Sequence, residues 1–398
     1  MKFIPVCEPF LDGNESVYVN DCLNTGWISS SGKYVDAFEQ KFAKYSEVNH
    51  AVSVCNGTVA IHLALVAAGV KKGDEVIIPN FTMIATAFAV CYTGAMPVFV
   101  DAEKETWNID VSEIEEKITS KTKVIMPVSI FGHPCNMNEI NKLAKKYNLL
   151  VIEDAAESHG AEYQGKKIGS VADITTFSFY ANKNLTTGEG GMVVTNNEDL
   201  YKKIKYYKNL CFPIDSARNY KHDNIGFNYR LSNIHAAIGL AQVEKADQYK
   251  KMRIENADRY KKFLSNTKGI TFQKTKQDVV NVHWVNGIVI DPIIYGRTRD
   301  ELMQYLKNNG VNVKYINSFD NESDVRVFLK NTNVKEINIY NPVDNWLEKR
   351  IISSCLKEKI KINIHENPLF LTKKSELIPF FSPTKKKLFQ TSFYKNQR

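Results

Sequence analysis

The sequence has no apolar run long enough to cross a membrane. A spanning helix needs roughly 20 apolar residues, and the longest apolar stretches, such as the one that ends at Pro79, are much shorter. The first residues also lack the apolar segment of about 7 to 15 residues that follows a basic start in a secretory signal. With 43% hydrophobic and 24% charged residues, the composition is that of a globular protein. We therefore expect a cytoplasmic protein.

Cysteine and histidine are too scattered to predict a disulfide framework or a metal site. No two of the seven cysteines form a CxxC motif, and an odd number does not fit a set of paired bridges. His159, His222 and His283 are not spaced as metal ligands usually are. We expect reduced cysteines that pack in the interior, and no bound metal. The cysteines are Cys7, Cys22, Cys55, Cys91, Cys135, Cys211 and Cys355.

The basic charge is concentrated at the carboxyl end. Residues 314–398 contain 16 Lys and Arg against 9 Asp and Glu, a net charge of +7 (16 − 9), whereas the whole chain carries +8. Because aromatic residues alternate with these lysines, a nucleic-acid surface is one interpretation. A solvated helix face with aromatic core positions is the other, and the lack of a phosphate-binding motif favours it. The aromatic residues are Trp346, Phe380, Phe381, Phe389, Phe393 and Tyr394.

Up to about residue 200, short runs rich in β-branched residues alternate with helical patterns. This alternation predicts an α/β fold in which helices cover both faces of one sheet. The predicted strands are 51–56, the runs DEVIIPN, MPVFVDA, TKVIMPVSIF and NLLVIEDAA, and 174–180 and 190–196. The predicted helices include 84–93, 111–119 and 137–147.

A long helical pattern from Ser232 to about Phe263 separates this region from a smaller one. Beyond it, VHWVNGIVID predicts a strand, and a helix that is capped by Thr298 and ended by Gly310 should follow. Long helices of this kind commonly connect two domains. We therefore expect a large domain over residues 1–245 and a smaller α/β domain over residues 246–398.

Asp154 and Lys183 are the most informative pair of polar residues. Asp154 ends the predicted strand LLVIED, and Lys183 lies in the loop after FSFY. Ligands of open α/β sheets bind beyond the carboxyl ends of the strands, so we expect both side chains in one crevice. Pyridoxal 5'-phosphate (PLP) requires a lysine for a Schiff base and a carboxylate beside its pyridine nitrogen. Taken singly, such a lysine is usually a surface residue and such an aspartate a helix cap.

A predicted phosphate site lies at the same end of the sheet. Asn56, Gly57 and Thr58 join a strand to a helix, where free backbone N–H groups and the helix dipole attract an anion. Ser178 can add a hydroxyl group. A turn of this kind is otherwise a common N-cap, so its combination with the aspartate and the lysine is what indicates a cofactor site.

Seven blocks of the sequence, taken in order, resemble the DegT/DnrJ/EryC1/StrS family of sugar aminotransferases, and within it the GDP-perosamine synthases most. The resemblance extends from about Ile4 to Val313. It implies a fold type I PLP-dependent transferase, with a large mixed-sheet domain that binds PLP and a smaller α/β carboxyl-terminal domain. The blocks are CNGTVAIHLAL, GDEVIIPNFT, TGAMPVFVD, FGHPCNM, IEDAAESHGA, DITTFSFYANKNLTTGEGGMVVTN and IGFNYRLSNIHAAIGLAQ.

Position by position, the resemblance implies roles for the cofactor-binding residues. Lys183 would form the Schiff base and carry protons between the amino acid, the cofactor and the sugar. Asp154 would pair with the pyridine nitrogen, and Glu157 would lie near the ring hydroxyl, where many relatives have glutamine. The residues that would hold the phosphate are Gly57, Thr58 and Ser178.

Three further positions follow from the resemblance. Asn228, in GFNYRLSN, would reach the phosphate of the neighbouring subunit's cofactor, which implies a homodimer with shared active sites. The WISSSG stretch (27–32) matches a segment near the sugar, although Ser-Gly clusters are ordinary loops as often. Met83 replaces an aromatic residue that stacks on the pyridine ring, and its thioether can also cover a ring. Alternatively, Met83 is a core residue, and Phe81 or Phe88 lies closer to the cofactor.

The implied reaction transfers an amino group from glutamate to a nucleotide-linked 4-keto-6-deoxy sugar, a step of polysaccharide biosynthesis. A free amine does not easily displace a ketone oxygen, whereas PLP can carry the nitrogen while neutral Lys183 acts as the base. A related branch has histidine at this position and removes a hydroxyl group, so the lysine argues against a dehydratase. The alternatives are a catalytically impaired relative and a nucleic-acid-associated protein that acts through its basic tail.

Residues 314–398 depart from the family pattern. Segments such as HENPLFLTKKSEL and LFQTSFYK resemble part of the deoxyribodipyrimidine photolyase-related proteins. A complete flavin-binding domain does not fit in this length, so we expect no flavin and no light-driven activity. VKEINIYNP and KIKINIHE alternate like strands around the helical pattern DNWLEKRIISSCLKE, which predicts a βαβ unit that completes the smaller domain.

Overall fold

The computed structural model describes residues 7–214, 222–309, 311, 336–340 and 361–365. The chain forms two compact units, residues 1–314 and residues 315–398, and each is described by itself. This division lies elsewhere than the expected domain boundary after residue 245, which remains a prediction. Within the described ranges, no helix has both the length and the apolar character that crossing a membrane demands.

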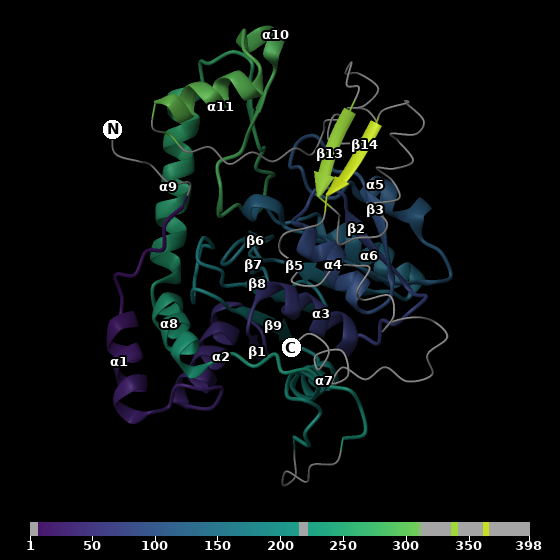
Figure 1. Ribbon diagram of the computed structural model, residues 1–398, viewed down its shortest axis with the longest axis vertical. Coiled ribbons are helices and arrows are strands. Elements are labelled where there is room, and N and C mark those ends of the chain that lie inside the picture. The colour runs from purple at the N-terminus through teal and green to yellow at the C-terminus, as the bar shows by residue number, and fades with distance from the viewer. Residues whose placement is uncertain (1–6, 215–221, 310, 312–335, 341–360, 366–398) are drawn as a thin grey trace. The chain divides into compact units, whose positions relative to one another are not determined.

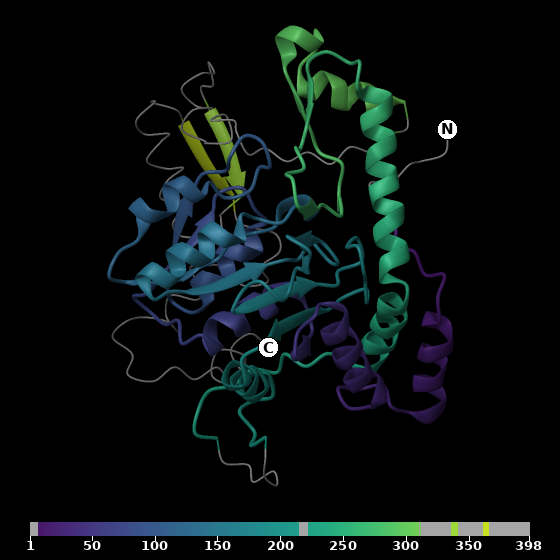
Figure 2. The same ribbon diagram turned by 180° about the vertical axis from the view of Figure 1, so that it is seen from behind.

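A seven-stranded mixed sheet is the main sheet of the first unit (Figures 1 and 2). Its strands are β1 His50–Val54, β2 Glu75–Pro79, β3 Met96–Val100, β4 Thr122–Ile125, β5 Leu150–Asp154, β8 Ile174–Ser178 and β9 Gly191–Thr195. The strand order is β1-β9-β8-β5-β4-β2-β3. β9 runs antiparallel to both of its neighbours, and all other neighbouring strands are parallel. Each strand overlaps a predicted one, so the predicted α/β sheet is confirmed.

Helices cover both faces of the sheet because alternate side chains of each strand point to opposite faces. The main helices are α2 Lys33–Tyr45, α3 Gly57–Ala67, α4 Ile84–Tyr92, α6 Met137–Tyr147, α7 Glu198–Lys208 and α8 Asn233–Glu244. α3, α4 and α7 pack on the face that contains Ile152 and Val193. α2 and α8 pack on the face that contains Met192, and α6 packs against Val151. The predicted helix at 111–119 is shorter, with α5 Val111–Ile114 followed by the 3-10 turn η1 Glu115–Lys117.

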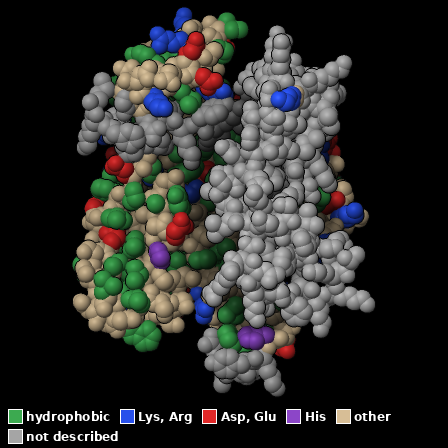
Figure 3. All heavy atoms as spheres, in the orientation of Figure 1, with side chains coloured by type: hydrophobic (Ala, Val, Ile, Leu, Met, Phe, Trp, Pro, Cys, Tyr) green, Lys and Arg blue, Asp and Glu red, His purple; other side chains and the backbone are tan. Residues whose placement is uncertain are grey.

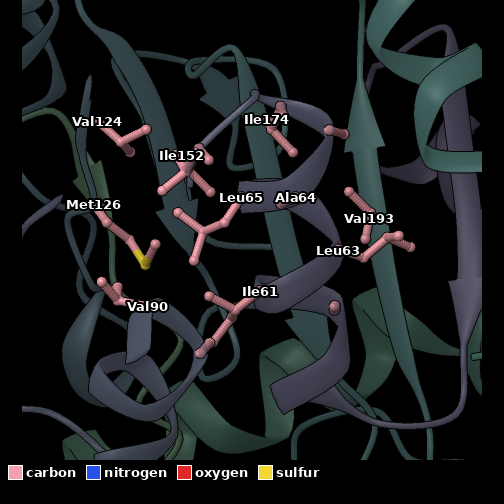
Figure 4. Close-up of a cluster of buried hydrophobic side chains, with 14 of the residues drawn as sticks. Ile61, Leu63, Ala64, Leu65, Val90, Val124, Met126, Ile152, Ile174 and Val193 are labelled. Carbon is pink, nitrogen blue, oxygen red and sulfur yellow. The ribbon is translucent and has the colours of Figure 1, made fainter. Parts of the chain in front are cut away.

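α3 is buried along most of its length. Figure 4 shows Ile61 and Leu65 of this helix among the side chains of the sheet. Leu65 is fully buried, and a side chain of this size contributes ~1.5–3 kcal/mol when it leaves water. The Asn56 side chain caps the helix by accepting a hydrogen bond from the backbone N–H of Val59 at 3.0 Å. The N-terminus of α3, which begins at Gly57, is therefore held at the carboxyl end of β1.

The predicted single helix from Ser232 to Phe263 is in fact two helices. α8 ends at Glu244, and α9 extends over Ala246–Leu264. Lys245 interrupts them with φ −110° and ψ 9°, values outside the α-helical range. The ammonium group of Lys245 forms an ion pair with Asp12 at 2.9 Å and also donates to the Asp12 carbonyl. The prediction of one continuous helix was wrong, because the backbone leaves the helical range at Lys245 and the helical pattern of the sequence does not show this break.

The chain after α9 forms small elements. They are β10 Ile270–Phe272, β11 Val279–Val280, β12 Ile288–Ile290, α10 Pro292–Tyr295 and α11 Arg299–Asn308, and β11 pairs with the hairpin of β6 Glu162–Tyr163 and β7 Lys166–Lys167. Thr298 caps α11 with a full capping box, as predicted. The predicted strand VHWVNGIVID was wrong over 282–287, where the backbone N–H groups of Val282 and Trp284 hydrogen-bond to the 3-10 turn η2 Ile130–Gly132 instead.

The second unit contains two described strands. β13 Glu336–Tyr340 and β14 Lys361–His365 pair in parallel. Parallel neighbours need a crossover connection, so this pairing agrees with the predicted βαβ arrangement. The predicted helix between the two strands lies outside the described residues, and so do Cys355 and the aromatic residues of the basic tail.

Candidate active site

Asp154 is the last residue of β5, at the carboxyl edge of the main sheet. Its side chain is 4% exposed. The Thr86 hydroxyl of α4 donates to Asp154 Oδ2 at 2.8 Å, and the backbone N–H of Ala156 donates to Oδ1 at 3.2 Å. Burial raises the pKa of the Asp154 carboxyl, and these two hydrogen bonds and the charge of Lys183 oppose the rise. The carboxylate is thus buried, oriented from two sides and within the field of a cation.

Lys183 lies in the loop between β8 and β9 and points toward Glu157. Its Nζ is 3.7 Å from Glu157 Oε1, and both side chains are about nine-tenths buried. Glu157 Oε2 also accepts a hydrogen bond from the backbone N–H of Phe131 at 2.7 Å. Burial raises the pKa of Glu157, whereas Lys183 and Phe131 oppose the rise. Lys183 acts electrostatically on both Glu157 and Asp154, so Asp154 and Lys183 lie close together, as expected.

A glycine lets α3 approach β8 closely at the predicted phosphate site. A Cβ atom at Gly57 would lie 2.7 Å from the Cβ of Ser178, which is closer than two carbon atoms pack. Ser178 ends β8 and is buried, while Thr58 is half-buried in the first turn of α3. Backbone N–H groups at this helix start and the Ser178 hydroxyl therefore share one small region, and such an arrangement suits a phosphate group.

Met83 is exposed, so the alternative that it is a core residue was wrong. Its side chain is 63% accessible to solvent at the N-terminus of α4. The Met83 carbonyl accepts a hydrogen bond from the backbone N–H of Thr86 at 3.1 Å, so Met83 lies one helical turn before the residue that binds Asp154. Phe81 is buried and packs edge to face against Phe131, and Phe88 is about half exposed.

Asn228 lies in a segment that pairs with the end of β1. The backbone N–H of Cys55 donates to the Tyr229 carbonyl at 2.9 Å, next to the turn that leads into α3. The Asn228 side chain is exposed and accepts a hydrogen bond from Arg230 Nε at 2.9 Å. Asn228 is therefore at the surface near the phosphate site, and its predicted contact with a neighbouring subunit remains a prediction.

The WISSSG loop is attached to the start of α8. The Asn233 side chain donates to the Trp27 carbonyl at 2.7 Å and accepts from the backbone N–H of Tyr34 at 3.0 Å. A cavity of about 430 Å³ adjoins this loop, and its lining includes Ser30, Lys208 and Arg230. The predicted sugar segment and the segment that contains Asn228 thus border one basic cavity.

The histidines named from the sequence do not form a metal site. Within the described ranges, no group of three or more His, Cys, Asp or Glu residues could hold a metal ion. His159 is buried among Phe42, Phe177 and Phe179, and burial lowers its pKa to about 3. His283 is also buried, with a pKa lowered to about 4, and His222 is exposed and contacts a backbone carbonyl. The first two are neutral packing residues at physiological pH.

Trp284 is a site residue that the sequence analysis missed. Lys183 Nζ lies 3.6 Å from the centroid of its ring. The segment around Trp284 was predicted to be a strand, and nothing in its local pattern connects it to Lys183. The contact can be found only from the structure, in which the backbone N–H groups of Val282 and Trp284 hydrogen-bond to the turn at 131–132.

Comparisons with known proteins identify the family of this chain. The model of the DegT/DnrJ/EryC1/StrS aminotransferase family matches residues 9–353, past the Val313 limit of the resemblance noted in the sequence. The GDP-perosamine synthase of Escherichia coli O157:H7 is 49% identical over 306 residues, which are 77% of this chain and 82% of that protein.

Solved structures with the same fold lead to the same family. DesI, in the presence of its TDP-sugar product, is 30% identical with a TM-score of 0.72, and the match covers 78% of each chain. The PLP form of Spr1654 from Streptococcus pneumoniae, described as a sugar aminotransferase, is 27% identical with a TM-score of 0.72 and covers 78% of this chain and 84% of that one. With a fold type I sheet whose carboxyl edge brings together Asp154, Glu157 and Lys183, this chain belongs to the DegT/DnrJ/EryC1/StrS aminotransferase family.

Proposed function

We propose that the protein transfers an amino group from glutamate to the keto carbon of a GDP-linked 4-keto-6-deoxy sugar, with PLP as cofactor. The observation that carries the proposal is the buried group of Lys183, Asp154 and Glu157 beside the turn at Gly57. The choice of a GDP-linked sugar is supported by relatives that are named GDP-perosamine synthase, one of them 49% identical.

The residues present fit PLP. A carboxylate that is buried and oriented by two hydrogen bonds, as Asp154 is, suits a protonated pyridine nitrogen. α3 approaches Ser178 so closely that no Cβ atom fits at Gly57. The backbone N–H groups at the start of α3 and the Ser178 hydroxyl would then bind the phosphate. When bound, PLP supplies an electron sink for a carbanion and a carrier for the amino group.

Lys183 is the proposed proton carrier. Its ammonium forms an ion pair with Glu157 at 3.7 Å, and a lysine must lose a proton from its ammonium group before it can act as a base. Glu157 is held by the backbone N–H of Phe131, so it keeps a fixed direction toward the lysine. Its role is to hold Lys183 in place and to accept a hydrogen bond from the ring hydroxyl of the cofactor.

A homodimer with shared sites is part of the proposal. Asn228 and Arg230 are linked at the surface beside the end of β1. In an isologous dimer the same surface of both subunits forms the interface. We infer that this surface includes Asn228, which would then reach the partner's phosphate. Exposed apolar side chains supply contact area. On the face in Figure 3, hydrophobic side chains gather at the lower left, where α1 Glu15–Thr25 lies in Figure 1, and Val17 and Leu23 are more than half exposed.

The test follows a nitrogen label. Purified protein is incubated with PLP, ¹⁵N-glutamate and a GDP-linked 4-keto-6-deoxyhexose, and the sugar nucleotide is examined by mass spectrometry. The label should appear on the sugar with the wild-type protein and not with Lys183→Arg, which keeps the charge but positions it differently. Consumption of glutamate without label on the sugar would favour a catalytically impaired relative and would contradict the proposal.

A further inference from the structure

Trp284 touches the Lys183 loop in two independent ways. The face of its ring lies under the ammonium group, with 3.6 Å between Nζ and the ring centroid. Its indole N–H donates a hydrogen bond to the carbonyl of Asn182 at 2.7 Å. One side chain therefore contacts both the charged end of the lysine and the backbone that precedes it.

The position of Trp284 is fixed by long-range backbone hydrogen bonds. The backbone N–H of Trp284 donates to the Phe131 carbonyl at 2.8 Å, and that of Val282 donates to the Gly132 carbonyl at 3.2 Å. The same Phe131 binds Glu157 through its backbone N–H. The tryptophan ring and the glutamate carboxylate, which both face Lys183, are thus held by one turn of the chain.

Arg253 of α9 supports the tryptophan from behind. Its Nη1 donates to the Trp284 carbonyl at 2.9 Å, and its Nη2 donates to Cys7 Sγ at 3.2 Å. The Cys7 thiol in turn donates to the Asn182 carbonyl at 3.2 Å. These contacts form a closed ring of hydrogen bonds through Arg253, Cys7, Asn182 and Trp284. Lys183 is the residue directly after Asn182 in the chain.

The Trp284 ring adds to the electrostatic attraction that the charged groups around Lys183 exert on its ammonium group. Glu157 attracts the ammonium at 3.7 Å, and Asp154 acts on it from β5. His159 and His283 are buried with pKa values lowered to about 3 and about 4, so neither adds positive charge at neutral pH. An aromatic face beneath a partly desolvated ammonium adds a further attraction.

We propose that Trp284 is a positioning residue that holds Lys183 beside Glu157 whenever the lysine is not joined to the cofactor. The inference rests on the proposed function in that Lys183 is taken as the lysine that reacts with PLP. The ring stabilises the ammonium form, and the indole N–H fixes the backbone from which the side chain extends. Trp284 thereby sets both the place to which the free lysine returns and the pH at which it becomes nucleophilic.

The test measures the reactivity of Lys183 in the full-length protein freed of cofactor. Trace acetic anhydride is added over a range of pH, and acetylation of Lys183 is followed by mass spectrometry. Trp284→Leu should move the midpoint of labelling down by about one pH unit, since the cation–π attraction is lost. Trp284→Phe keeps an aromatic face and should retain most of the wild-type midpoint.

The matched control is Trp107→Leu. Trp107 packs against the same Phe131 ring, with centroids 5.9 Å apart, whereas the ring beneath the Lys183 ammonium is that of Trp284, so loss of Trp107 should leave the midpoint unchanged. A wild-type midpoint in folded Trp284→Leu, or an equal shift in Trp107→Leu, would overturn the inference. If Trp284→Leu does not fold, Trp284→Phe provides the test, because it removes the hydrogen bond from the indole N–H to the Asn182 carbonyl. This loss should speed backbone hydrogen exchange in the Lys183 loop. Unchanged exchange would contradict a role for this hydrogen bond.

The two proposals fail separately. Labelling of Lys183 requires neither PLP nor a sugar, so its result is independent of the amination assay. Amination with an unmoved labelling midpoint would contradict only the role of Trp284. A shifted midpoint without amination would contradict only the proposed reaction.

Discussion

Thr86 donates its hydroxyl hydrogen bond to Asp154 Oδ2 at 2.8 Å, and so connects the first turn of α4 to the end of β5. The same hydroxyl is 2.9 Å from that of Thr82. The hydrogen bond opposes the effect of burial, which raises the pKa of Asp154. The carboxylate is thereby kept closer to the charged form that a protonated pyridine nitrogen requires.

Replacing Thr86 by Val should weaken cofactor retention roughly tenfold, the effect of losing one hydrogen bond to a buried charged group. The pKa of Asp154 rises further without its donor, and the carboxylate is less available. A spectroscopic titration with PLP gives the dissociation constant. Thr86→Ser is the control, because it keeps the hydroxyl group. Equal retention in Thr86→Val and wild type would show that this donor does not act on the site.

Gly57→Ala should lower the free energy of unfolding by ~1–3 kcal/mol, as overpacking does. The new Cβ would lie 2.7 Å from that of Ser178. In a Ser178→Gly background the same change should cost less, because the nearest obstructing atom is gone, and urea unfolding of all four proteins gives this coupling. Identical costs in the two backgrounds would mean that the contact between α3 and β8 is not what demands glycine.

Glu153 should make the protein less stable as the pH rises. This carboxyl is fully buried beside Asp154, and burial raises its pKa to about 7. A folded-state pKa above the unfolded value means that the folded state binds the proton more tightly, so its contribution is complete below about pH 4.5 and is lost as the pH passes 7. Glu153→Gln should remove this loss, and the difference in unfolding free energy between the two proteins should grow from pH 5 to pH 8. A constant difference would contradict the shift.

His159 should have the opposite effect on the acidic side. Its pKa is lowered to about 3, so the unfolded chain binds a proton that the folded protein excludes, and stability falls as the pH drops below about 6.5. His159→Phe fits the surrounding aromatic rings and cannot be protonated. This variant should keep more of its stability between pH 6.5 and pH 4 in thermal unfolding experiments. Parallel curves for both proteins would exclude His159 as the source.

Complementation between subunits tests the shared site. Asn228→Ala and Lys183→Ala should each be inactive or strongly impaired as homodimers. A mixed dimer contains one site with an intact Lys183 and the partner's intact Asn228, so mixing the two proteins after dissociation should restore a substantial part of the activity. No recovery in verified mixed dimers would argue against residues contributed across the interface.

The strands and the Asp154–Lys183 crevice could be predicted because they depend on local patterns. Buried strands appear as apolar runs, and parallel strands bring their carboxyl ends to one edge, so Asp154 and the loop with Lys183 had to be neighbours. The strand-to-helix turn at Gly57 could also be predicted, and its close approach to Ser178 is seen in the structure, whereas the binding of a phosphate there remains a prediction. These inferences needed no knowledge of contacts between distant segments.

Three features of the structure could not be predicted from local sequence patterns. The break between α8 and α9 lies at Lys245, whose ammonium group also pairs with Asp12. Trp284 lies beside Lys183, and the backbone N–H groups of Val282 and Trp284 hydrogen-bond to the turn at 131–132. Met83 is exposed although its neighbours in sequence are apolar. The contact of Trp284 depends on pairing between segments far apart in the chain, and the periodicity of the sequence predicts neither this pairing nor the other two features.

The reversed direction of β9 has a consequence for how the position of Lys183 can be adjusted. Ser178 and Gly191 face each other across β8 and β9, and Gly191 also faces Val54 at the end of β1. The loop between Ser178 and Gly191 therefore begins and ends at paired residues of the sheet, so both of its ends are fixed. The length and composition of this loop can therefore change while β8 and β9 stay in register, so the position of the Lys183 amine can be adjusted without a change in the strands.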